Sequence, residues 1–252
     1  MTQTDYRDEV VWIIGASSGI GAALARECSA RGARLALSAR RKDALDQLKD
    51  TLAGDHKIFP LDVAHADDVL RTAQAIRAVF GRLDRVIYLA AVYTPMQICV
   101  LDLAVTRQIV EVNLLGVFHA LHAVLPLFKE QQKGQIALCG SVAGYIGLPG
   151  GQPYSATKAG VMNIAESLVA ELPDYIDVKL ISPGFVRTEL TDKNSFDMPM
   201  IIGADQAARS IADGLRDSGF EVHFPKRFTI WLKILRLLPY SLAFRITKAL
   251  KR

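Results

Sequence analysis

The chain has 252 residues, of which 50% are hydrophobic and 22% are charged, and its formal net charge is +4 at pH 7. This length and hydrophobicity suit one α/β domain with a sizeable core, which excludes an intrinsically disordered protein and does not require a second domain. The basic balance does not indicate nucleic-acid binding by the body of the chain. Eight basic and no acidic residues lie in residues 226–252, and subtracting these eight charges from +4 leaves −4 for the rest.

Short apolar runs alternate with amphipathic segments along the chain. The apolar runs predict seven strands, at 10–15, 34–39, 57–61, 85–90, 135–140, 177–182 and 220–224. The amphipathic segments predict helices at 20–31, 42–52, 66–80, 103–128, 154–172 and 205–216, with Gly32 and Gly81 ending the first and third. The alternation predicts a single Rossmann-like, doubly wound parallel sheet with helices on both faces. We expect a catalytic domain over 1–225 and a basic extension over 226–252.

The stretch IIGASSGIGAALA follows the first predicted strand and opens the first predicted helix. Gly15 permits a tight exit from the strand, Gly19 lets the backbone approach a pyrophosphate, and Gly21 allows close contact between helix and sheet. The helix N-terminus then presents free N–H groups to the anion. The stretch therefore predicts a dinucleotide-binding turn, and the alternative is a structural turn rich in glycine.

The residues after the second predicted strand indicate which nucleotide is bound. A fold that binds NAD usually places an acidic residue there, but this chain reads SARRKD, and Ala39 has no carboxylate. The guanidinium groups of Arg40 and Arg41 suit a 2′-phosphate, with Ser17 as a further hydrogen-bond partner. We predict NADP(H), with NAD(H) as the alternative; Arg41 and Lys42 also fit the solvated start of a helix.

Tyr154 and Lys158 lie four residues apart in the stretch PYSATKAG. Residues at this spacing share one face of a helix. An ordinary tyrosine has a pKa of about 10, and a nearby cation lowers it. The pair could therefore be a general acid/base, although in isolation the spacing is more typical of a half-exposed tyrosine beside a solvated lysine on a helix surface.

The basic segment 226–252 consists of two amphipathic pieces separated by Pro239. Basic amphipathic helices with a tryptophan can lie in a membrane interface, and they can equally cover a substrate mouth or pack against a partner subunit. The expected polar faces are Thr229, Lys233 and Arg236 in the first piece, and Ser241, Arg245, Lys248 and Arg252 in the second.

The cysteines, the N-terminus and the histidines indicate the cellular compartment and whether a metal is bound. The scattered cysteines 28, 99 and 139 predict reduced, buried thiols in a cytosol-like compartment. The N-terminus is polar, so no signal peptide is expected. The sequence contains no run of about 18 apolar residues, so no membrane span is expected. The histidines at 56, 65, 119, 122 and 223 have no spacing typical of metal ligands, so no metal is expected.

Six motifs occur in an order and spacing that resemble the short-chain dehydrogenase/reductase superfamily. The resemblance covers residues 9–224, and the motifs are GASSGIG (15–21), LDV (61–63), EVNLLG (111–116), GSVAG (140–144), YSATK (154–158) and SPGFVRT (182–188). It implies an oxidoreductase that uses NAD(P) and acts on CH–OH groups. The Asn-Asn-Ala-Gly that the family carries after its fourth strand is replaced by Tyr88-Leu89-Ala90-Ala91, so we expect an altered cofactor wall with activity kept.

The resemblance also implies roles for single residues. Tyr154 would be the catalytic acid/base, Lys158 would hold the nicotinamide ribose and lower the pKa of the phenol, and Ser141 would hydrogen-bond the substrate oxygen. Asn113 would join a proton relay by holding a water near Lys158. The expected cofactor-binding residues are Gly15, Ser17, Ser18, Gly19, Ile20, Gly21, Arg40, Arg41, Asp62, Val63, Ala90, Tyr154, Lys158, Pro183, Gly184, Val186 and Thr188.

The expected mouth of the site is apolar, which predicts a hydrophobic carbonyl or alcohol substrate under a mobile lid at 188–203. Its residues are Tyr145, Ile146, Leu148, Pro149, Phe185, Leu190, Met198 and Met200. The helices 103–128 and 154–172 resemble the pair that forms dimers in the family, so we expect a homo-oligomer. We expect a cytoplasmic protein without a nucleic-acid partner, with membrane contact through the basic segment as one alternative.

The leading prediction is hydride transfer between NADP(H) and a carbonyl or alcohol, with Tyr154 as general acid/base. One rival is a catalytically idle nucleotide-binding sensor or scaffold, which only the departure at Leu89 favours. The other rival is an NAD-dependent alcohol dehydrogenase of the same fold.

Overall fold

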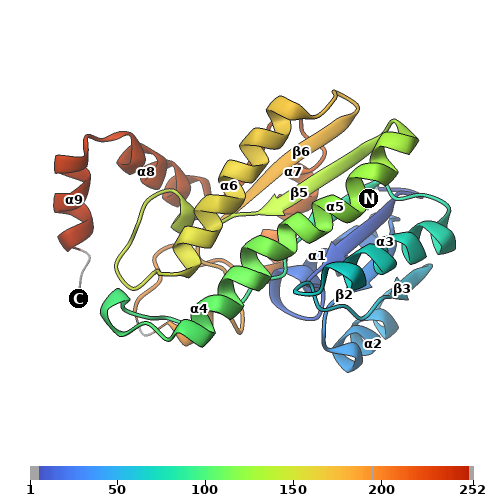
Figure 1. The fold of residues 1–252 in the computed structure, drawn as a ribbon, viewed down its shortest axis with the longest axis horizontal. Coiled ribbons are helices and arrows are strands. Elements are labelled where there is room, and N and C mark those ends of the chain that lie inside the picture. The colour runs from blue at the N-terminus through green and yellow to red at the C-terminus, as the bar shows by residue number, and fades with distance from the viewer. Residues whose placement is uncertain (1–5, 195, 250–252) are drawn as a thin grey trace.

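Seven parallel strands form one sheet in the computed structural model, which describes residues 6–194 and 196–249 (Figure 1). The strand order is β3-β2-β1-β4-β5-β6-β7, so the order reverses direction between β1 and β4. The strands are β1 (Val10–Ile14), β2 (Arg34–Ser38), β3 (His56–Ile58), β4 (Arg85–Tyr88), β5 (Gly134–Cys139), β6 (Ile176–Pro183) and β7 (Glu221–Phe224). The predicted doubly wound parallel sheet is therefore confirmed.

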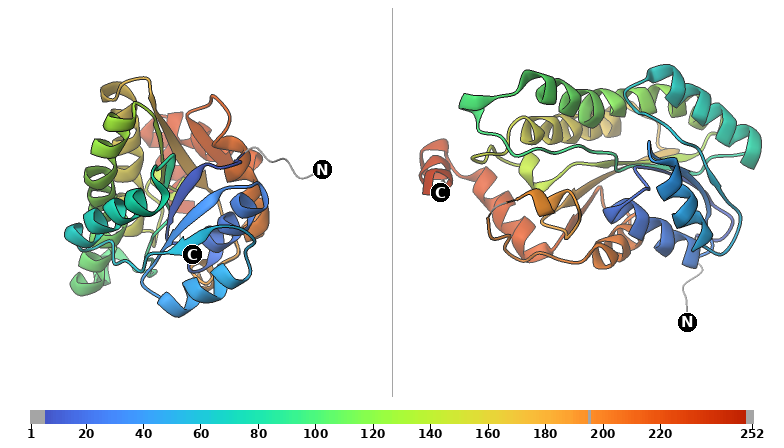
Figure 2. Two further views of the ribbon diagram at one scale, coloured as in Figure 1. Left: turned by 90° about the vertical axis from the view of Figure 1, so that its right-hand side faces the viewer. Right: turned by 90° about the horizontal axis from the view of Figure 1, so that it is seen from below.

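Helices cover both faces of the sheet, as the views in Figure 2 show. On one face, α3 (Ala66–Phe80), α5 (Gly116–Gln131) and α6 (Tyr154–Glu171) contribute to one large apolar core. On the other, α1 (Gly19–Ala30), α2 (Lys42–Asp50) and α7 (Ala204–Gly214) contribute to a second core. The central strands are buried on both sides, which explains why they read as continuous apolar runs.

The third strand is shorter than predicted, because it ends at Ile58 before Pro60. Proline lacks the N–H that a strand needs, so regular pairing stops there. Phe59 and Leu61 still donate backbone hydrogen bonds to Leu37 (2.8 Å) and Ala39 (3.0 Å) of the neighbouring chain segment. The loop that follows therefore keeps its place at the carboxyl edge of the sheet.

The long helix predicted at 103–128 contains a change of helical geometry. It consists of α4 (Leu103–Val110), a π-helical turn at Glu111–Leu115, and α5. Asn113 lies at the centre of that turn, and π-helical insertions are frequent at functional sites. Helix ends and turns of this kind depend on tertiary contacts, so the apolar periodicity did not reveal it.

The same helical stretch, Leu103–Gln131, passes a length and hydropathy test for a membrane span, which the sequence analysis did not expect. Its most apolar window is 44% buried inside the structure. Buried core helices pass the same test, and α5 packs on α3 and on the sheet, so we interpret the stretch as a core helix.

The basic segment forms two helices, α8 (Lys226–Leu237) and α9 (Tyr240–Ala249), at the end of the molecule where Figure 1 shows the C-terminus. Leu232, Leu235 and Ala243 belong to the same apolar core as α3, α5 and α6. The expected polar face is wrong for Thr229, which is fully buried, and Arg252 lies outside the described residues. The inner side of the basic segment therefore packs on the body of the protein.

The expectation of three buried thiols is wrong for Cys99. Cys28 and Cys139 are buried and free, and burial raises the pKa of Cys28 to about 12. Cys99 lies in the short helical turn Ile98–Val100, between β4 and α4, and its side chain is exposed. Apolar neighbours in the sequence do not bury a residue when the loop itself lies on the surface.

Candidate active site

The glycine-rich turn brings the end of β1 into contact with the loop after β4. Gly15 has φ +98, and a Cβ there would lie 2.6 Å from the backbone nitrogen of Ala90. A Cβ on Gly21 would collide with the Gly15 carbonyl oxygen. Only glycine fits at these two positions, because a side chain would collide with neighbouring backbone atoms. The turn therefore lies close under the N-terminus of α1, and its backbone fits a bound pyrophosphate.

A cleft opens at the carboxyl ends of the strands, where the strand order reverses. Ligands of doubly wound sheets bind at such a reversal. The predicted cofactor residues that line it are Gly15, Ser17, Ser18, Gly19, Ile20, Gly21, Arg40, Arg41, Asp62, Val63, Ala90 and Thr188. Other residues line the cleft without having been predicted as cofactor contacts, namely Ile14, Ala39, Leu61, Ala91, Val92, Val112, Cys139 and Glu189.

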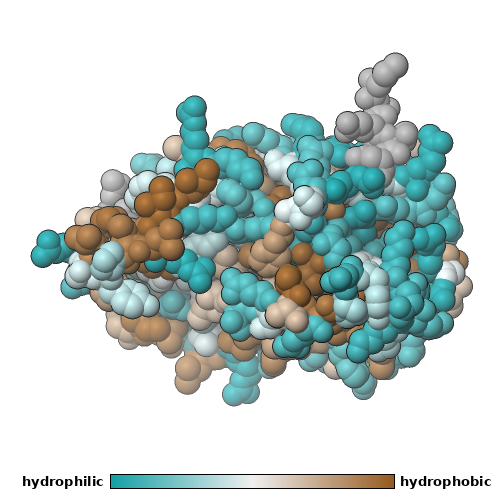
Figure 3. All heavy atoms as spheres, turned by 90° about the horizontal axis from the view of Figure 1, so that it is seen from above, coloured by the Kyte–Doolittle hydropathy of each residue, from teal (hydrophilic) through white to brown (hydrophobic). Residues whose placement is uncertain are grey.

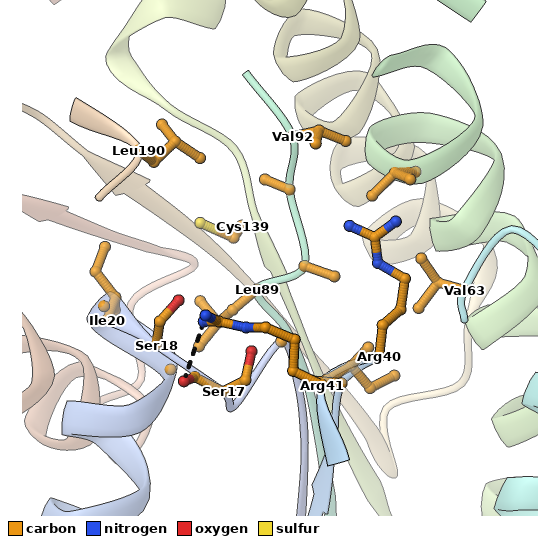
Figure 4. A pocket seen from close by; sticks show the side chains of 18 of the residues that line it. Ser17, Ser18, Ile20, Arg40, Arg41, Val63, Leu89, Val92, Cys139 and Leu190 are labelled. Carbon is orange, nitrogen blue, oxygen red and sulfur yellow. Dashed lines mark hydrogen bonds between the residues drawn. The ribbon is translucent and has the colours of Figure 1, made fainter. Parts of the chain in front are cut away.

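The two arginines after β2 both reach this cleft, and both are exposed. Figure 4 shows the guanidinium group of Arg41 turned toward Ser17 and Ser18, whereas Arg40 extends between Val63 and Val92. Arg41 lies 3.5 Å from the Ser17 carbonyl oxygen and 3.7 Å from the Glu189 carboxylate. The cleft therefore carries two cations on the side where β2 ends.

Five predicted cofactor residues do not line this cleft: Tyr154 and Lys158, which lie beside it, and Pro183, Gly184 and Val186. Pro183 ends β6, and Gly184 donates a backbone hydrogen bond to Phe224 (2.7 Å). Val186 is buried and pairs with Ile202 in an isolated bridge. Thr188, two residues later, does line the cleft and faces Gly19.

Tyr154 begins α6, and Lys158 follows one turn later on the same side. The Lys158 Nζ lies 5.5 Å from the centroid of the Tyr154 ring and donates a 2.7 Å hydrogen bond to the Cys139 carbonyl oxygen. Burial lowers the pKa of Lys158. The helix therefore holds both head groups at the end of β5, beside the cleft that Cys139 lines.

The expected lowering of the Tyr154 pKa is wrong for the protein by itself. Burial raises that pKa, the charge of Cys139 raises it further, and only the hydrogen bond with Ser141 opposes this rise. A cation at i+4 favours the phenolate, but taking a phenolate out of water disfavours it, and burial is the largest effect on the Tyr154 pKa.

Ser141 starts a short helical turn at Val142–Gly144, where its Oγ accepts a hydrogen bond from the Ala143 N–H (3.2 Å). Ser155, next to Tyr154, donates a 2.5 Å hydrogen bond to the Ala143 carbonyl oxygen. The turn that carries Ser141 is therefore fixed to the helix that carries Tyr154. The Ser141 hydroxyl interacts with the Tyr154 phenol and opposes the rise of the phenol's pKa.

Asn113 is fully buried, and its carboxamide is engaged by neighbouring groups. Its Oδ1 accepts from the Val92 N–H (2.8 Å), and its Nδ2 donates to the Val92 carbonyl oxygen (2.9 Å) and to the Thr157 Oγ1 (3.3 Å). The side chain thus fixes the loop after β4 to α6.

The loop after β4 keeps its position without the asparagine that the family usually carries there. Leu89 lines the cleft, and its N–H donates to the Ile14 carbonyl oxygen (2.8 Å). The Tyr88 hydroxyl donates to the Val112 carbonyl oxygen in the π-helical turn (2.6 Å). The hydrogen bond from Leu89 to β1 and the hydrogen bond from the Tyr88 hydroxyl therefore hold this altered part of the cofactor wall in place.

Tyr93 is a site residue that the sequence analysis missed. Its ring packs edge-on against the Tyr154 ring, with the centroids 5.0 Å apart. Its hydroxyl donates to the Asn194 Oδ1 (2.8 Å), and the Lys193 Nζ donates to its carbonyl oxygen (2.9 Å). Tyr93 therefore connects the segment predicted as a lid to the tyrosine in the site; Ser195 of that segment lies outside the described residues.

The apolar mouth is observed in part. Phe185 packs against Phe196 of the lid segment and Phe228 of α8, with ring centroids 5.8 Å and 5.4 Å apart. Tyr145 does not face the mouth as expected, because it is buried and its hydroxyl donates to the Glu221 carboxylate (2.5 Å). Within residues 6–194 and 196–249, no group of three or more His, Cys, Asp or Glu side chains is arranged to hold a metal ion.

Comparisons with known proteins agree on one family. The sequence model described as "short chain dehydrogenase" matches residues 9–198. An uncharacterized oxidoreductase of Myxococcus xanthus is 35% identical over 246 residues, which cover 96% of each chain. A solved short-chain dehydrogenase/reductase of Burkholderia phymatum in complex with NAD superposes with a TM-score of 0.85 at 22% identity, over 91% of this chain and 93% of the other. Levodione reductase superposes with a TM-score of 0.81 at 23% identity, over 89% and 99%.

Proposed function

The chain belongs to the short-chain dehydrogenase family and is an NAD(P)-dependent oxidoreductase, and from this premise we propose that it transfers a hydride between NADP(H) and a hydrophobic carbonyl or alcohol. One observation carries the proposal: the phenol of Tyr154, the hydroxyl of Ser141 and the ammonium of Lys158 gather beside the nucleotide cleft, on elements that pack on one another.

In the reductive direction, Tyr154 donates the proton that the carbonyl oxygen needs as negative charge develops on it. Ser141 hydrogen-bonds the same oxygen and stabilises that charge. NADPH, when bound, supplies the hydride. Because burial raises the pKa of Tyr154, the phenol is protonated and ready to donate at neutral pH, and Lys158 stabilises the phenolate that is left behind.

Several further residues support this chemistry. We assign Asn113 to the proton relay by resemblance, and its contacts with Val92 and Thr157 support a positioning role. The other cofactor contacts proposed are those named from the sequence, including Pro183, Gly184 and Val186. The proposed mechanism requires no metal ion.

We propose NADP(H) as the preferred cofactor because Arg40 and Arg41 line the cleft after β2. Two guanidinium groups favour an extra phosphate, whereas a ribose hydroxyl alone is better served by a carboxylate. The contact between Arg41 and Glu189 lowers the positive charge on that side, so NAD(H) stays as the alternative.

We propose a hydrophobic substrate because aromatic side chains surround the entrance beside Tyr154. Tyr93, Phe185 and Phe196 come from three different segments and contact one another or the catalytic ring. The lid segment carries Phe196, so its closure would exclude water from the reacting groups.

The remaining proposals concern assembly and location. A homo-oligomer through the helices α5 and α6 rests on the family resemblance, and Phe118 of α5 and Val169 of α6 are exposed on them. The three free thiols favour a location in the cytoplasm. We propose that the basic segment brings the protein into contact with a membrane surface there.

The test is a panel of aliphatic and aromatic ketones and aldehydes, screened for consumption of NADPH. We expect turnover with at least one apolar carbonyl, and loss of about 10³-fold or more in kcat for Tyr154→Phe with unchanged NADPH binding. Tyr240→Phe is the matched control, because it removes the hydroxyl of an exposed tyrosine in α9. NADPH binding without turnover of any carbonyl would favour the idle sensor, and near-normal turnover of Tyr154→Phe would refute the role of the phenol.

A further inference from the structure

Helix α8 presents an apolar stripe to solvent. Ile230, Trp231, Ile234 and Leu237 are all exposed, and Leu237 is 83% exposed. Their spacing of one, three and three residues places them on one face of the helix. This stripe is the side of α8 opposite to Thr229, Leu232 and Leu235, which pack on the body.

Helix α9 continues this surface after Pro239. Tyr240 and Phe244 stack with their ring centroids 5.3 Å apart, and both are exposed. Leu242 and Ile246 are exposed as well, but their positions along the helix place them on another side of α9. Figure 3 shows apolar side chains gathered at the end of the molecule where Figure 1 places α8 and α9. We call the exposed residues Ile230, Trp231, Ile234 and Leu237 of α8 and Tyr240 and Phe244 of α9 the tail face.

The orientation of α8 is unusual for a helix on a protein surface. Thr229, which is polar, is fully buried, and its Oγ1 is hydrogen-bonded to the His223 Nδ1 (2.6 Å). The exposed positions are instead filled by isoleucine, leucine and tryptophan. An exposed apolar surface of this size marks a site of interaction, because a solvated helix would present polar residues there.

The charges beside the tail face indicate what binds to it. Arg227, Arg236, Arg245 and Lys248 are exposed along the same two helices, and residues 226–249 contain no acidic side chain. The body carries the opposite charge balance. An anionic surface is attracted to such a segment, whereas a second copy of the same face would bring the cations of both chains together.

The lengths of α8 and α9 indicate whether they span an anionic membrane or lie on its surface. Helix α8 has 12 residues and α9 has 10, and a membrane span requires about 20. Apolar and aromatic side chains flanked by arginine and lysine suit a helix that lies in the plane of the headgroup region. We propose that the tail face binds the surface of an anionic lipid bilayer, with α8 and α9 lying along it.

The proposal takes up the membrane contact named above and does not depend on the reaction. Co-sedimentation of the full chain with vesicles tests it without a substrate. We expect binding to phosphatidylcholine vesicles that contain about 30% phosphatidylserine, at least about tenfold weaker binding to phosphatidylcholine alone, and release at about 0.5 M salt.

The chain has two tryptophans, which gives a second readout. Trp12 is fully buried in β1, and its Nε1 donates to the Ser38 Oγ (2.9 Å), so a change of emission on adding vesicles reports on Trp231. We expect the emission of Trp231 to shift to shorter wavelength with the anionic vesicles, and no shift in a Trp231→Phe variant.

The double variant Ile234→Glu/Leu237→Glu tests the face itself, because both side chains are exposed and the fold does not bury them. We expect at least a tenfold loss of vesicle binding with unchanged circular dichroism. Val79→Glu is the matched control, since Val79 is an exposed apolar residue of α3 and should leave binding unchanged.

Three outcomes would overturn the proposal. The first is a wild-type chain that does not bind the anionic vesicles, and the second is a double variant that binds them as well as the wild type does. The third is a self-association, measured by analytical ultracentrifugation, that the double substitution abolishes while lipid binding is absent. In that case a second copy of the chain, and not a lipid surface, covers the tail face.

Discussion

The protonation state of Tyr154 differs from the simplest expectation for a tyrosine beside a lysine. Burial raises its pKa above the ordinary value of about 10, so the protonated phenol is present below the raised pKa and is lost only as pH rises through it. Carbonyl reduction uses the protonated form, and alcohol oxidation uses the phenolate.

We therefore predict opposite pH dependences for the two directions. The rate of carbonyl reduction should stay nearly constant between about pH 6 and 9, whereas the rate of alcohol oxidation should rise with pH over the same range. Initial rates at saturating cofactor in each direction measure both. A reduction rate that falls steeply as pH rises from about 7 to 9 would show that the proton comes from a group of lower pKa.

Arg40 is the residue on which the preference for NADP(H) can be tested. Arg40→Ala removes the charged hydrogen-bond donor that we propose for the 2′-phosphate, and we expect it to weaken NADPH binding by about 10- to 100-fold and NADH binding by less than about twofold. Lys42→Ala is the matched control, because Lys42 is an exposed neighbouring cation that pairs with Asp46 (2.7 Å). Fluorescence titration gives both Kd values; an equal loss for the two nucleotides would contradict the assignment.

Single residues of the site were predictable where the spacing along one helix determines proximity. Tyr154 and Lys158 are such a pair, and so are the glycines whose missing Cβ atoms make room for the turn. Tyr93 was not predictable, because its partners Asn194 and Tyr154 lie on segments that only the tertiary fold brings together. The pKa of Tyr154 depends on burial, which the sequence does not specify.

At the scale of elements, Glu221 joins three parts of the fold. It lies in β7, accepts a 2.5 Å hydrogen bond from Tyr145 beside the Ser141 turn, and pairs with Lys233 of α8 (2.5 Å). Burial raises the pKa of Glu221, but the bonds from Lys233 and Tyr145 outweigh burial, and the pKa is lowered. The carboxylate therefore stabilises the fold above its unfolded-state pKa of about 4.3, and this contribution is lost as pH falls through the lowered folded-state pKa.

We predict that Glu221→Gln lowers the free energy of unfolding by about 1–3 kcal/mol at neutral pH, because the ion pair with Lys233 is lost. The difference between variant and wild type should shrink at acidic pH, as the pH falls through the lowered folded-state pKa and the wild-type carboxyl becomes protonated. Urea unfolding at both pH values measures it. The same difference at both pH values would show that the charge of Glu221 does not contribute.

The elements of the body were predictable, because strands buried on both sides read as apolar runs and covering helices read as amphipathic patterns. Two features were not. The π-helical turn at Glu111–Leu115 depends on contacts such as the Tyr88 hydroxyl on Val112, and periodicity does not detect one extra residue in a turn. The orientation of α8 reverses the usual rule, since its threonine is buried and its tryptophan is exposed.

At the scale of the whole molecule, the basic segment is attached to the main core through the buried side of its helices. Leu232 of α8 is 2% exposed and belongs to the core of α3, α5 and α6, whereas Leu237, one and a half turns later, is exposed. The boundary predicted at residue 225 therefore marks a change of charge more than a change of domain.

A matched pair of substitutions in α8 tests this integration. Leu232→Ala should lower the free energy of unfolding by about 2–5 kcal/mol, because it opens a cavity in the core, while Leu237→Ala should change it by less than about 0.5 kcal/mol. Urea unfolding of both variants is the measurement. Equal small effects would show that α8 is only loosely attached to the body.

The central claim is that Tyr154 protonates a carbonyl oxygen while the nicotinamide delivers a hydride to its carbon. The most direct measurement uses NADPH that carries deuterium at the transferable C4 position, with mass spectrometry of the alcohol formed from an apolar carbonyl. We predict one deuterium on the former carbonyl carbon, and no labelled alcohol above background from Tyr154→Phe. An unlabelled product, or equal labelling by the variant, would contradict the account.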